Sequence, residues 1–217
     1  MPDQFNFPGL TCERFVLGPF QVNTYLVFDS ESRELIVVDP AFAPAKLLDR
    51  VAQLDSSKVL IFLTHAHSDH ILGVEPLKKA TKAEVACSAE DAPMLTDPIL
   101  NLSQFFGSPV SISPPERVLK HQDELALGSH KARVIAVPGH TIGGLALHFP
   151  KMLFSGDTLF AGSIGRSDFP GGDGKLLLKM IKDRLLSLPN CAVFPGHGPE
   201  TEIAREKNDN PFLSGIS

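Results

Sequence analysis

The seven residues THAHSDH gather side chains that can bind metal ions. His65, His67, Asp69 and His70 lie within six positions, and zinc takes imidazole nitrogens and carboxylate oxygens as ligands. The apolar run at 59–63 predicts a buried strand that ends at this motif. Because alternate residues of an extended chain point to the same side, His65 and His67 can share one ion, while Asp69 and His70 can face a second. The alternative, a polar loop with scattered histidines, accounts poorly for four such residues together.

Three later predicted strands each lead into a glycine and then a residue that can bind metal. The motifs PGHT, SGDT and PGHG place His140, Asp157 and His197 there. Glycine lets a backbone turn sharply and approach an ion closely, and loops beyond sheet strands are where binding sites are usually built. Seven candidate ligands then divide into two metal sites that Asp157 can bridge: His65, His67 and His140 in one, and Asp69, His70 and His197 in the other.

Short strands and amphipathic helices surround these motifs and predict a layered packing of sheets and helices. Helices are expected at 46–54, 71–80 and 175–186, and the stretch 89–95 begins like a helix. Short strands separated by turn residues are expected in the second half of the chain, at 125–127, 131–137, 145–149, 152–155 and 192–194.

The stretch 98–115 is rich in Ser and Pro and predicts an irregular excursion over the surface of the fold. It carries Phe105 and Phe106. These two aromatic side chains either border a substrate groove or pack in the core, and core packing is the favoured interpretation.

The composition is that of an ordinary globular chain, with 217 residues, 43% hydrophobic content and a net charge of -5. No run of Lys or Arg supports nucleic acid as a partner. The cysteines Cys12, Cys87 and Cys191 are too widely spaced for a metal pair or a disulfide framework, which favours a reducing compartment. Since no signal peptide or membrane-spanning run is found, a cytoplasmic protein without a membrane partner is expected. No linker or repeat divides residues 1–217, so one domain is expected.

In this order, THAHSDH, PGHT, GDT and PGHG resemble the motifs of the metallo-β-lactamase superfamily, and they extend over most of the chain. Within that superfamily, GDTLFAGSIGRSDFPGGD and the ending GHGPETEIAREKNDNPFL are similar to the short bacterial glyoxalase II-like hydrolases. The resemblance implies an α+β fold, a four-layer αββα sandwich with the metals at one edge of two facing sheets. It also implies hydrolysis of S-D-lactoylglutathione or a related hydroxyacylglutathione, which would be a small-molecule thioester partner.

The resemblance also points to basic residues that bind glutathione. The basic residue of the family's G-K/R motif is matched by Arg166, and Arg205 and Lys207 can add positive charge if the C-terminal tail folds back. The tyrosines that accompany this motif are not matched, because the only tyrosine is Tyr25. Little chain follows His197, so a short tail is expected in place of the helical domain of the longer glyoxalase II enzymes.

The predicted chemistry depends on two divalent ions, with zinc favoured over iron or manganese. A water held between two ions loses a proton near neutral pH, and the resulting hydroxide attacks the thioester carbonyl to release the hydroxy acid and the free thiol. Asp69 and Asp157 are the catalytic candidates, because they would orient this hydroxide while binding the ions. Asp39 and Thr141 are candidates to hydrogen-bond the ligands from behind. A monomer is favoured.

Other functions fit some of the same residues. A persulfide dioxygenase that uses a single iron needs only three ligands, and the stretch GRSDF is compatible with it. A hydrolase of a β-lactam or a phosphoester can use the same two ions, since fold and metals do not determine the substrate. A scaffold or ligand-sensing module with a vestigial site is disfavoured, because no ligand position is lost.

Overall fold

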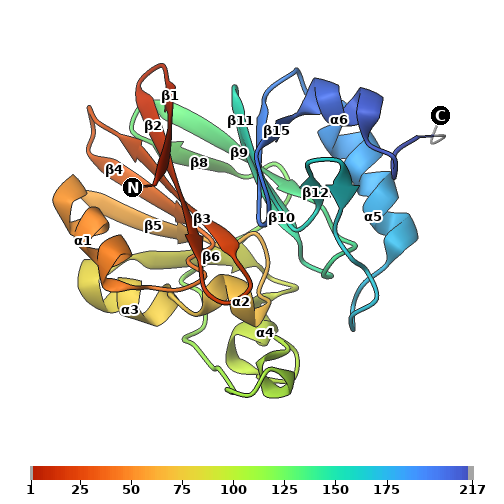
Figure 1. Ribbon diagram of the computed structural model, residues 1–217. Helices are drawn as coiled ribbons and strands as arrows, with labels where there is room; N and C mark the ends of the chain where they lie inside the picture. The colour runs from red at the N-terminus through yellow and green to blue at the C-terminus, as the bar shows by residue number, and fades with distance from the viewer. Residues whose placement is uncertain (1, 215–217) are drawn as a thin grey trace.

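Two sheets lie face to face in the computed structural model, which describes residues 2–214 (Figure 1). The first sheet contains seven strands in the order of the sequence: β1 (Asp3–Phe7), β2 (Leu10–Leu17), β3 (Val22–Asp29), β4 (Glu34–Val38), β5 (Lys58–Phe62), β6 (Glu84–Ser88) and β7 (Arg117–Leu119). The second contains six strands, here in spatial order: β15 (Thr201–Glu202), β14 (Ala192–Pro195), β11 (Met152–Gly156), β10 (Leu145–Phe149), β9 (His130–Ala136) and β8 (Glu124–Leu127). A separate small hairpin is formed by β12 (Leu159–Phe160) and β13 (Ser163–Ile164).

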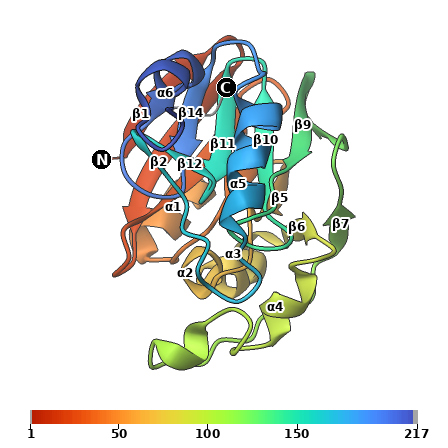
Figure 2. The same ribbon diagram turned by 90° about the vertical axis from the view of Figure 1, so that its right-hand side faces the viewer.

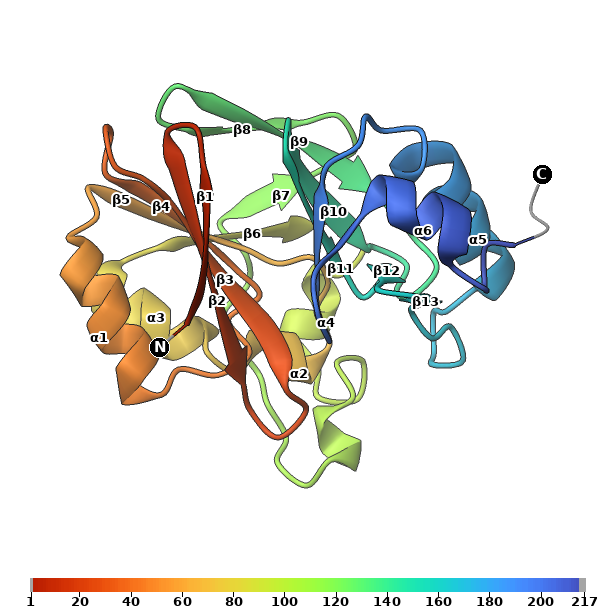
Figure 3. The ribbon, with the colours of Figure 1, turned by 45° about the horizontal axis from the view of Figure 1, so that its top comes forward.

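Helices cover the outer faces of both sheets. The α-helices of the described residues are α1 (Ala45–Leu54), α2 (Ser68–Ile71), α3 (Val74–Thr81), α4 (Ala92–Thr96), α5 (Gly174–Met180) and α6 (Ile203–Asp209), and α5 continues into a π-helical turn, Ile181–Leu185. Figure 3 shows α1 and α3 outside the first sheet and α5 and α6 outside the second. The predicted α+β fold, a four-layer αββα sandwich, is confirmed.

The layer between the sheets is held together by aromatic side chains. Tyr25 on β3 packs against Phe154 on β11 and Phe194 on β14, with ring centroids 5.2 and 5.5 Å apart. All three rings are almost completely buried. Each buries a large apolar surface and is a major source of the hydrophobic free energy that joins the two sheets.

Parallel pairing brings the first metal-binding motif to one edge of the first sheet. β4, β5 and β6 are parallel neighbours, and their nearly continuous apolar sequences fit strands with both faces covered. The carboxyl ends of parallel strands lie at the same edge. Asp39 therefore follows β4 beside the THAHSDH motif, which follows β5.

The helix predicted at 71–80 is interrupted in the structure. It forms two helices, α2 and α3, that are separated at Leu72 and Gly73. A side chain at Gly73 would have its Cβ 2.6 Å from the carbonyl oxygen of Pro40, and the Gly73 N–H donates to that same oxygen. The close approach to the loop after β4 needs glycine and ends the first helix.

The stretch 98–115 is irregular as predicted, and its only helical part is a 3-10 turn at Ser103–Phe105. Figure 2 shows this excursion and α4 extending below the two sheets. The favoured prediction for its two aromatic side chains is wrong, because Phe105 is 67% and Phe106 55% exposed. Other residues of the stretch do reach the interior: Leu102 is 6% and Ile112 7% exposed, and Ile112 packs in the apolar cluster of the first sheet.

The chain after β14 was expected to be a short tail. It forms β15 and then α6, which had not been predicted as elements. Ile203 and Leu213 from this segment pack in the same apolar cluster as Leu177 and Ile181 of the α5 layer. The assignment of residues 1–217 to one domain stays a prediction. No helix within the described residues is long and apolar enough to span a bilayer.

We expect Phe154→Ala to lower the free energy of unfolding by about 3–5 kcal/mol, because it leaves a cavity between the sheets. Urea denaturation at equilibrium measures the change. The matched control is Phe105→Ala, which removes an exposed ring and should cost less than about 0.5 kcal/mol. Equal losses in the two variants would contradict the inter-sheet role of Phe154.

Candidate metal centre

All seven predicted ligands come together at one edge of the two facing sheets. Two groups have ligand atoms within 4.8 Å of one another: His65, His67 and His140 form the first, and Asp69, His70 and His197 form the second. The first sheet supplies the four residues of the THAHSDH motif after β5. The second sheet supplies His140 between β9 and β10, Asp157 after β11 and His197 after β14.

Asp157 lies between the two groups. Its Oδ2 is 3.7 Å from Nε2 of His140, in the first group, and 3.4 Å from Nε2 of His197, in the second. Its Oδ1 is 3.5 Å from Nε2 of His70. Of the seven residues, Asp157 is therefore the one whose carboxylate faces both groups.

Hydrogen bonds behind the imidazoles determine which nitrogen faces the site. Asp39 Oδ2 accepts from His70 Nδ1 at 3.0 Å and from the Thr64 hydroxyl at 2.6 Å. Since the Thr64 hydroxyl donates to Asp39, it accepts from Nδ1 of His65, 3.0 Å away. His140 Nδ1 donates to the carbonyl oxygen of Arg166 at 2.7 Å. In His65, His70 and His140, Nε2 is thus left to face the centre.

Asp39 orients ligands and is not itself placed as one. It lies within 4.8 Å of ligand atoms of His65 and His70. Both of its oxygens are already occupied, because Oδ1 accepts from the Thr64 N–H at 2.7 Å and Oδ2 accepts the two bonds described above. The sequence predicted a role behind the ligands for Asp39, and its contacts fit that role. The part taken by Thr64 was not predicted.

The buried polar atoms without a hydrogen-bond partner at the centre fit a bound cation. Within residues 2–214, five buried side-chain polar atoms have no hydrogen-bond partner, and three of them belong to this cluster: His65 Nε2, His70 Nε2 and Asp157 Oδ1. An unpaired buried polar atom costs about 1–3 kcal/mol. Imidazole nitrogens and carboxylate oxygens that converge on one point are the donors preferred by zinc and by similar divalent ions.

The charges at the centre also favour cations. Burial opposes a charge on His70, but the carboxylates of Asp157 and Asp69 outweigh it and raise the pKa of His70 to about 9. Burial likewise opposes a charge on His197, yet the same two carboxylates raise its pKa to about 10. His67 differs, because burial and then His140 lower its pKa to about 3. Protons on His70 and His197 therefore balance the negative charge of the carboxylates, which divalent ions would balance if they were bound.

Buried polar residues outside the predicted set hold the ligand loops. Asp91 is buried, and it accepts from the Thr141 hydroxyl and the Gly143 N–H, both at 2.8 Å. Thr141, predicted to support the ligands, thus fixes the loop of His140 through Asp91 and not by contact with an imidazole. Nothing in the sequence around Asp91 marked this role.

The loop of His197 is held by the first sheet. The Asn23 side chain donates to the carbonyl oxygens of Pro195 and Gly198, at 2.9 and 2.8 Å, and the Tyr25 hydroxyl donates to Pro195 at 2.7 Å. A Cβ at Gly196 would lie 2.2 Å from Oδ1 of Asp157. Glycine at 196 therefore allows this loop to approach the site.

A small pocket of about 180 Å³ opens onto the centre. Apolar side chains form much of its wall: Phe20, Leu102, Phe106 and Phe169. Arg166 also lines it, with its guanidinium bound to both oxygens of Asp168 and stacked 3.9 Å from the centre of the Phe169 ring. Arg205 and Lys207 lie exposed on α6 and are not among the residues that line this pocket.

Comparison with known proteins identifies relatives of the whole chain. The family model described as the metallo-beta-lactamase superfamily matches residues 17–197. Hydroxyacylglutathione hydrolase GloC of Haemophilus influenzae is 36% identical over 203 residues, which cover 91% of this chain and 95% of the relative.

Three solved structures are similar over most of their length. The BLEG-1 B3 metallo-beta-lactamase is 35% identical with a TM-score of 0.89, covering 94% of this chain and 100% of that one. TTHA1623 in a di-iron-bound form is 38% identical with a TM-score of 0.79, covering 92% and 99%. ETHE1 from Myxococcus xanthus is 29% identical with a TM-score of 0.77, covering 94% and 84%.

We expect Asp39→Asn to weaken metal binding about 10–100-fold, the usual effect of losing a partner behind a ligand. An amide nitrogen at the position of Oδ2 donates only, so it can accept neither from the Thr64 hydroxyl nor from the His70 ring. Titration with zinc against a competing chelator measures the affinity. Asp29→Asn is the control, because Asp29 is also buried and hydrogen-bonded but lies at the far end of β3. Unchanged affinity in Asp39→Asn would contradict the orienting role.

Proposed function

This chain belongs to the metallo-β-lactamase superfamily and is a metallo-hydrolase, and from this premise we propose that it hydrolyses the thioester of a hydroxyacylglutathione. S-D-lactoylglutathione is the representative substrate, and the products are the hydroxy acid and free glutathione. The observation that carries the proposal is the double group of ligands joined by Asp157. Similarity to GloC over almost the full length of both chains supports the thioester.

We propose two divalent ions as the cofactors. The first would be held by the group His65, His67 and His140, and the second by the group Asp69, His70 and His197, with Asp157 facing both. When bound, such ions lower the pKa of a coordinated water and polarise a carbonyl oxygen. Zinc is the expected metal. Iron is the other candidate, since TTHA1623 is similar and has a di-iron-bound form.

The residues of the chain determine how the reaction is organised. Asp39 and Thr64 hold the imidazoles of His65 and His70 in one orientation, so little reorganisation is needed during the reaction. Asp69 and Asp157, the predicted catalytic residues, place negative charge where the attacking water would lie and can orient it. The thiol leaves as a thiolate without a strong acid, because thiols have a pKa of about 8.5.

Covalent catalysis by a cysteine is not supported by the structure. Cys12, Cys87 and Cys191 are buried, and burial raises the pKa of Cys87 to about 12 and that of Cys191 to about 11. Such thiols carry almost no thiolate at neutral pH and are poor nucleophiles. Direct attack by water on the thioester is therefore the proposed route.

Arg166 is the proposed contact for a carboxylate of the substrate. It lines the pocket and its side chain is 57% exposed. Guanidinium groups bind carboxylates through two parallel hydrogen bonds, and Asp168 occupies that position in the structure. A substrate carboxylate would have to displace Asp168. A monomeric state and a cytoplasmic location stay predictions.

A persulfide dioxygenase remains the second candidate, favoured by the similarity to ETHE1 from Myxococcus xanthus. A single iron at His65, His67 and His140 would leave the second group without a function. The intact group of Asp69, His70 and His197 therefore supports the hydrolase. A β-lactam substrate is the third candidate, and similarity to BLEG-1 supports it.

We expect the protein to bind two metal ions per chain and to hydrolyse S-D-lactoylglutathione. Elemental analysis of protein purified without chelator gives the metal count, and free thiol release gives the rate. Parallel assays measure oxygen consumption with glutathione persulfide and opening of a β-lactam. One iron with oxygen consumption would replace the proposal by the dioxygenase, and β-lactam turnover without thioester turnover would replace it by a lactamase.

We expect Asp157→Ala to be the most damaging single substitution at the centre. It removes the carboxylate that faces both ligand groups, so metal content and rate should fall together, the rate by more than about 100-fold. Elemental analysis and thioester hydrolysis are measured on the same samples. Asp49→Ala, on the exposed side of α1, controls for the loss of a carboxylate. Retention of both metals with a near-normal rate would refute the bridging position.

A further inference from the structure

A second hollow lies beside the metal centre and is larger than the pocket over it. It measures about 470 Å³ and is lined by residues of the β2–β3 hairpin and of the loop after β14. Phe20 and His197 line both hollows, so the two meet there. The pocket over the metals, about 180 Å³, is smaller than the roughly 300–1,000 Å³ typical of ligand sites. A tripeptide conjugate needs more room than that pocket offers.

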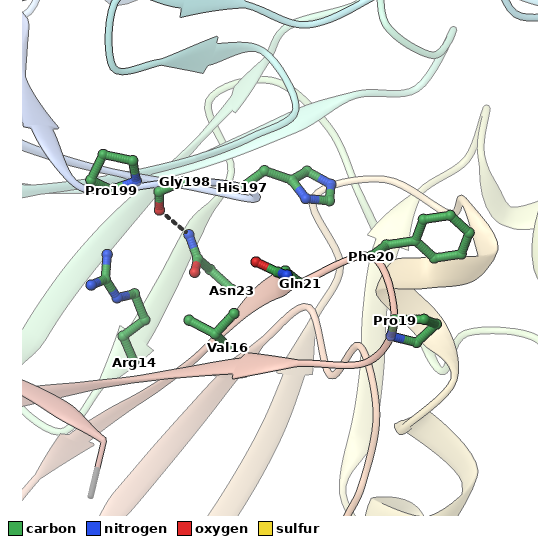
Figure 4. A pocket seen from close by; sticks show the side chains of 9 residues that line it. All are labelled: Arg14, Val16, Pro19, Phe20, Gln21, Asn23, His197, Gly198 and Pro199. Carbon is green, nitrogen blue, oxygen red and sulfur yellow. Dashed lines mark hydrogen bonds between the residues drawn. The ribbon is translucent and has the colours of Figure 1, made fainter.

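The hollow is an open continuation of the layer between the sheets. Arg14 and Val16 share a face of β2 with Leu10 and Cys12, which pack in the inter-sheet core. From the second sheet, His197, Gly198 and Pro199 line the hollow. Figure 4 shows Arg14 at one end of the hollow and Phe20 at the other, with His197, Gly198 and Pro199 along one wall.

Arg14 gives the far end of the hollow an unusual charge arrangement. Its guanidinium donates to Asp3 Oδ2, at 3.1 and 2.6 Å, and to Glu200 Oε2 at 2.7 Å. Three of its five N–H donors are thus used, and two remain. One guanidinium with two carboxylates has a net charge of about -1, which repels a simple anion. A group with both an ammonium and a carboxylate suits this arrangement, since the guanidinium attracts one end and Glu200 the other.

We propose that this hollow binds the thiol carrier of the substrate through an α-amino-acid end group. In glutathione, the γ-glutamyl end carries that ammonium and carboxylate. The inference rests on the proposed thioester function and specifies which part of the substrate lies where. The acyl group occupies the pocket over the metals, the γ-glutamyl end lies at Arg14 and Glu200, and the second carboxylate of glutathione is left for Arg166.

The spacing along the hairpin fits this assignment. His197 pairs with Val22 in an isolated β-bridge, and Val22 is opposite Leu17 on β2. Arg14 is three residues further along β2, roughly 10 Å, and two strand spacings of about 4.8 Å separate β2 from His197, so the two backbones are roughly 14 Å apart. The long Arg14 side chain spans part of that distance. An extended carrier covers about 3.3–3.6 Å per residue, so the two to three residue lengths between a cysteinyl sulfur and the γ-glutamyl end span the rest.

Binding of two unreactive ligands tests the proposal. S-methylglutathione has the γ-glutamyl end, and N-acetyl-S-methylcysteinylglycine lacks it but keeps the rest. Calorimetry should show that the wild-type protein binds the first about tenfold more tightly, the effect of one or two charge-assisted hydrogen bonds. Arg14→Met and Glu200→Gln should each lose most of this preference. Arg33→Met, which breaks the ion pair with Asp55 elsewhere on the surface, should keep it.

The outcomes separate this inference from the proposed function. Equal binding of both ligands to the wild type, no binding of either, or an unchanged preference in Glu200→Gln would overturn the inference. Because Glu200 is exposed, that variant is informative even if Arg14→Met fails to fold. A clear preference without hydrolysis of lactoylglutathione would support the hollow and refute the proposed function. Hydrolysis of lactoylglutathione without a preference between the two ligands would support the proposed function and refute the role of the hollow.

Discussion

Polar atoms in the gap between two sheets cannot all satisfy one another, and this constraint organises the structure. His65 Nε2, His70 Nε2 and Asp157 Oδ1 are buried without partners. The imidazoles donate hydrogen bonds from their opposite sides to Asp39, Thr64 and the Arg166 carbonyl oxygen, so the rings cannot turn to find other partners. Only positive charge at the centre relieves the arrangement. Protons can supply that charge, but divalent ions match the geometry of the donors better.

Buried apolar layers and glycine loops make this concentration of polar groups possible. The aromatic contacts of Tyr25, Phe154 and Phe194 hold the sheets together beside the centre. Their hydrophobic free energy offsets the cost of burying charged groups at the edge. Tyr25 contributes to the packing and to the site, because its ring lies in the core and its hydroxyl donates to the carbonyl oxygen of Pro195 in the loop of His197.

Two hollows of different character lie beside the candidate metal centre. Phe20 at the tip of the β2–β3 hairpin lies 5.3 Å from Phe106 of the excursion, measured between ring centroids. These two exposed rings narrow the entrance above the ligands and create an apolar wall for the acyl group. Beyond His197, the polar hollow that ends at Arg14 has a different character. A pocket with one apolar wall and a charged groove, which meet at the candidate metal centre, fit the proposed substrate with its small acyl group on a zwitterionic carrier.

The sequence by itself was enough to predict the candidate ligands and the fold family. Four ligand-type residues in THAHSDH, and three glycine-framed positions after other strands, were recognisable because ligand chemistry restricts residue type and strand ends restrict position. The tertiary structure alone decided which residues support them. Asp91 and Asn23 are far in sequence from the loops they hold, and only long-range packing brings them there. The tertiary structure also decided that Phe105 and Phe106 are exposed, because burial depends on what lies opposite a segment. It places Arg205 and Lys207 on α6, away from the pocket.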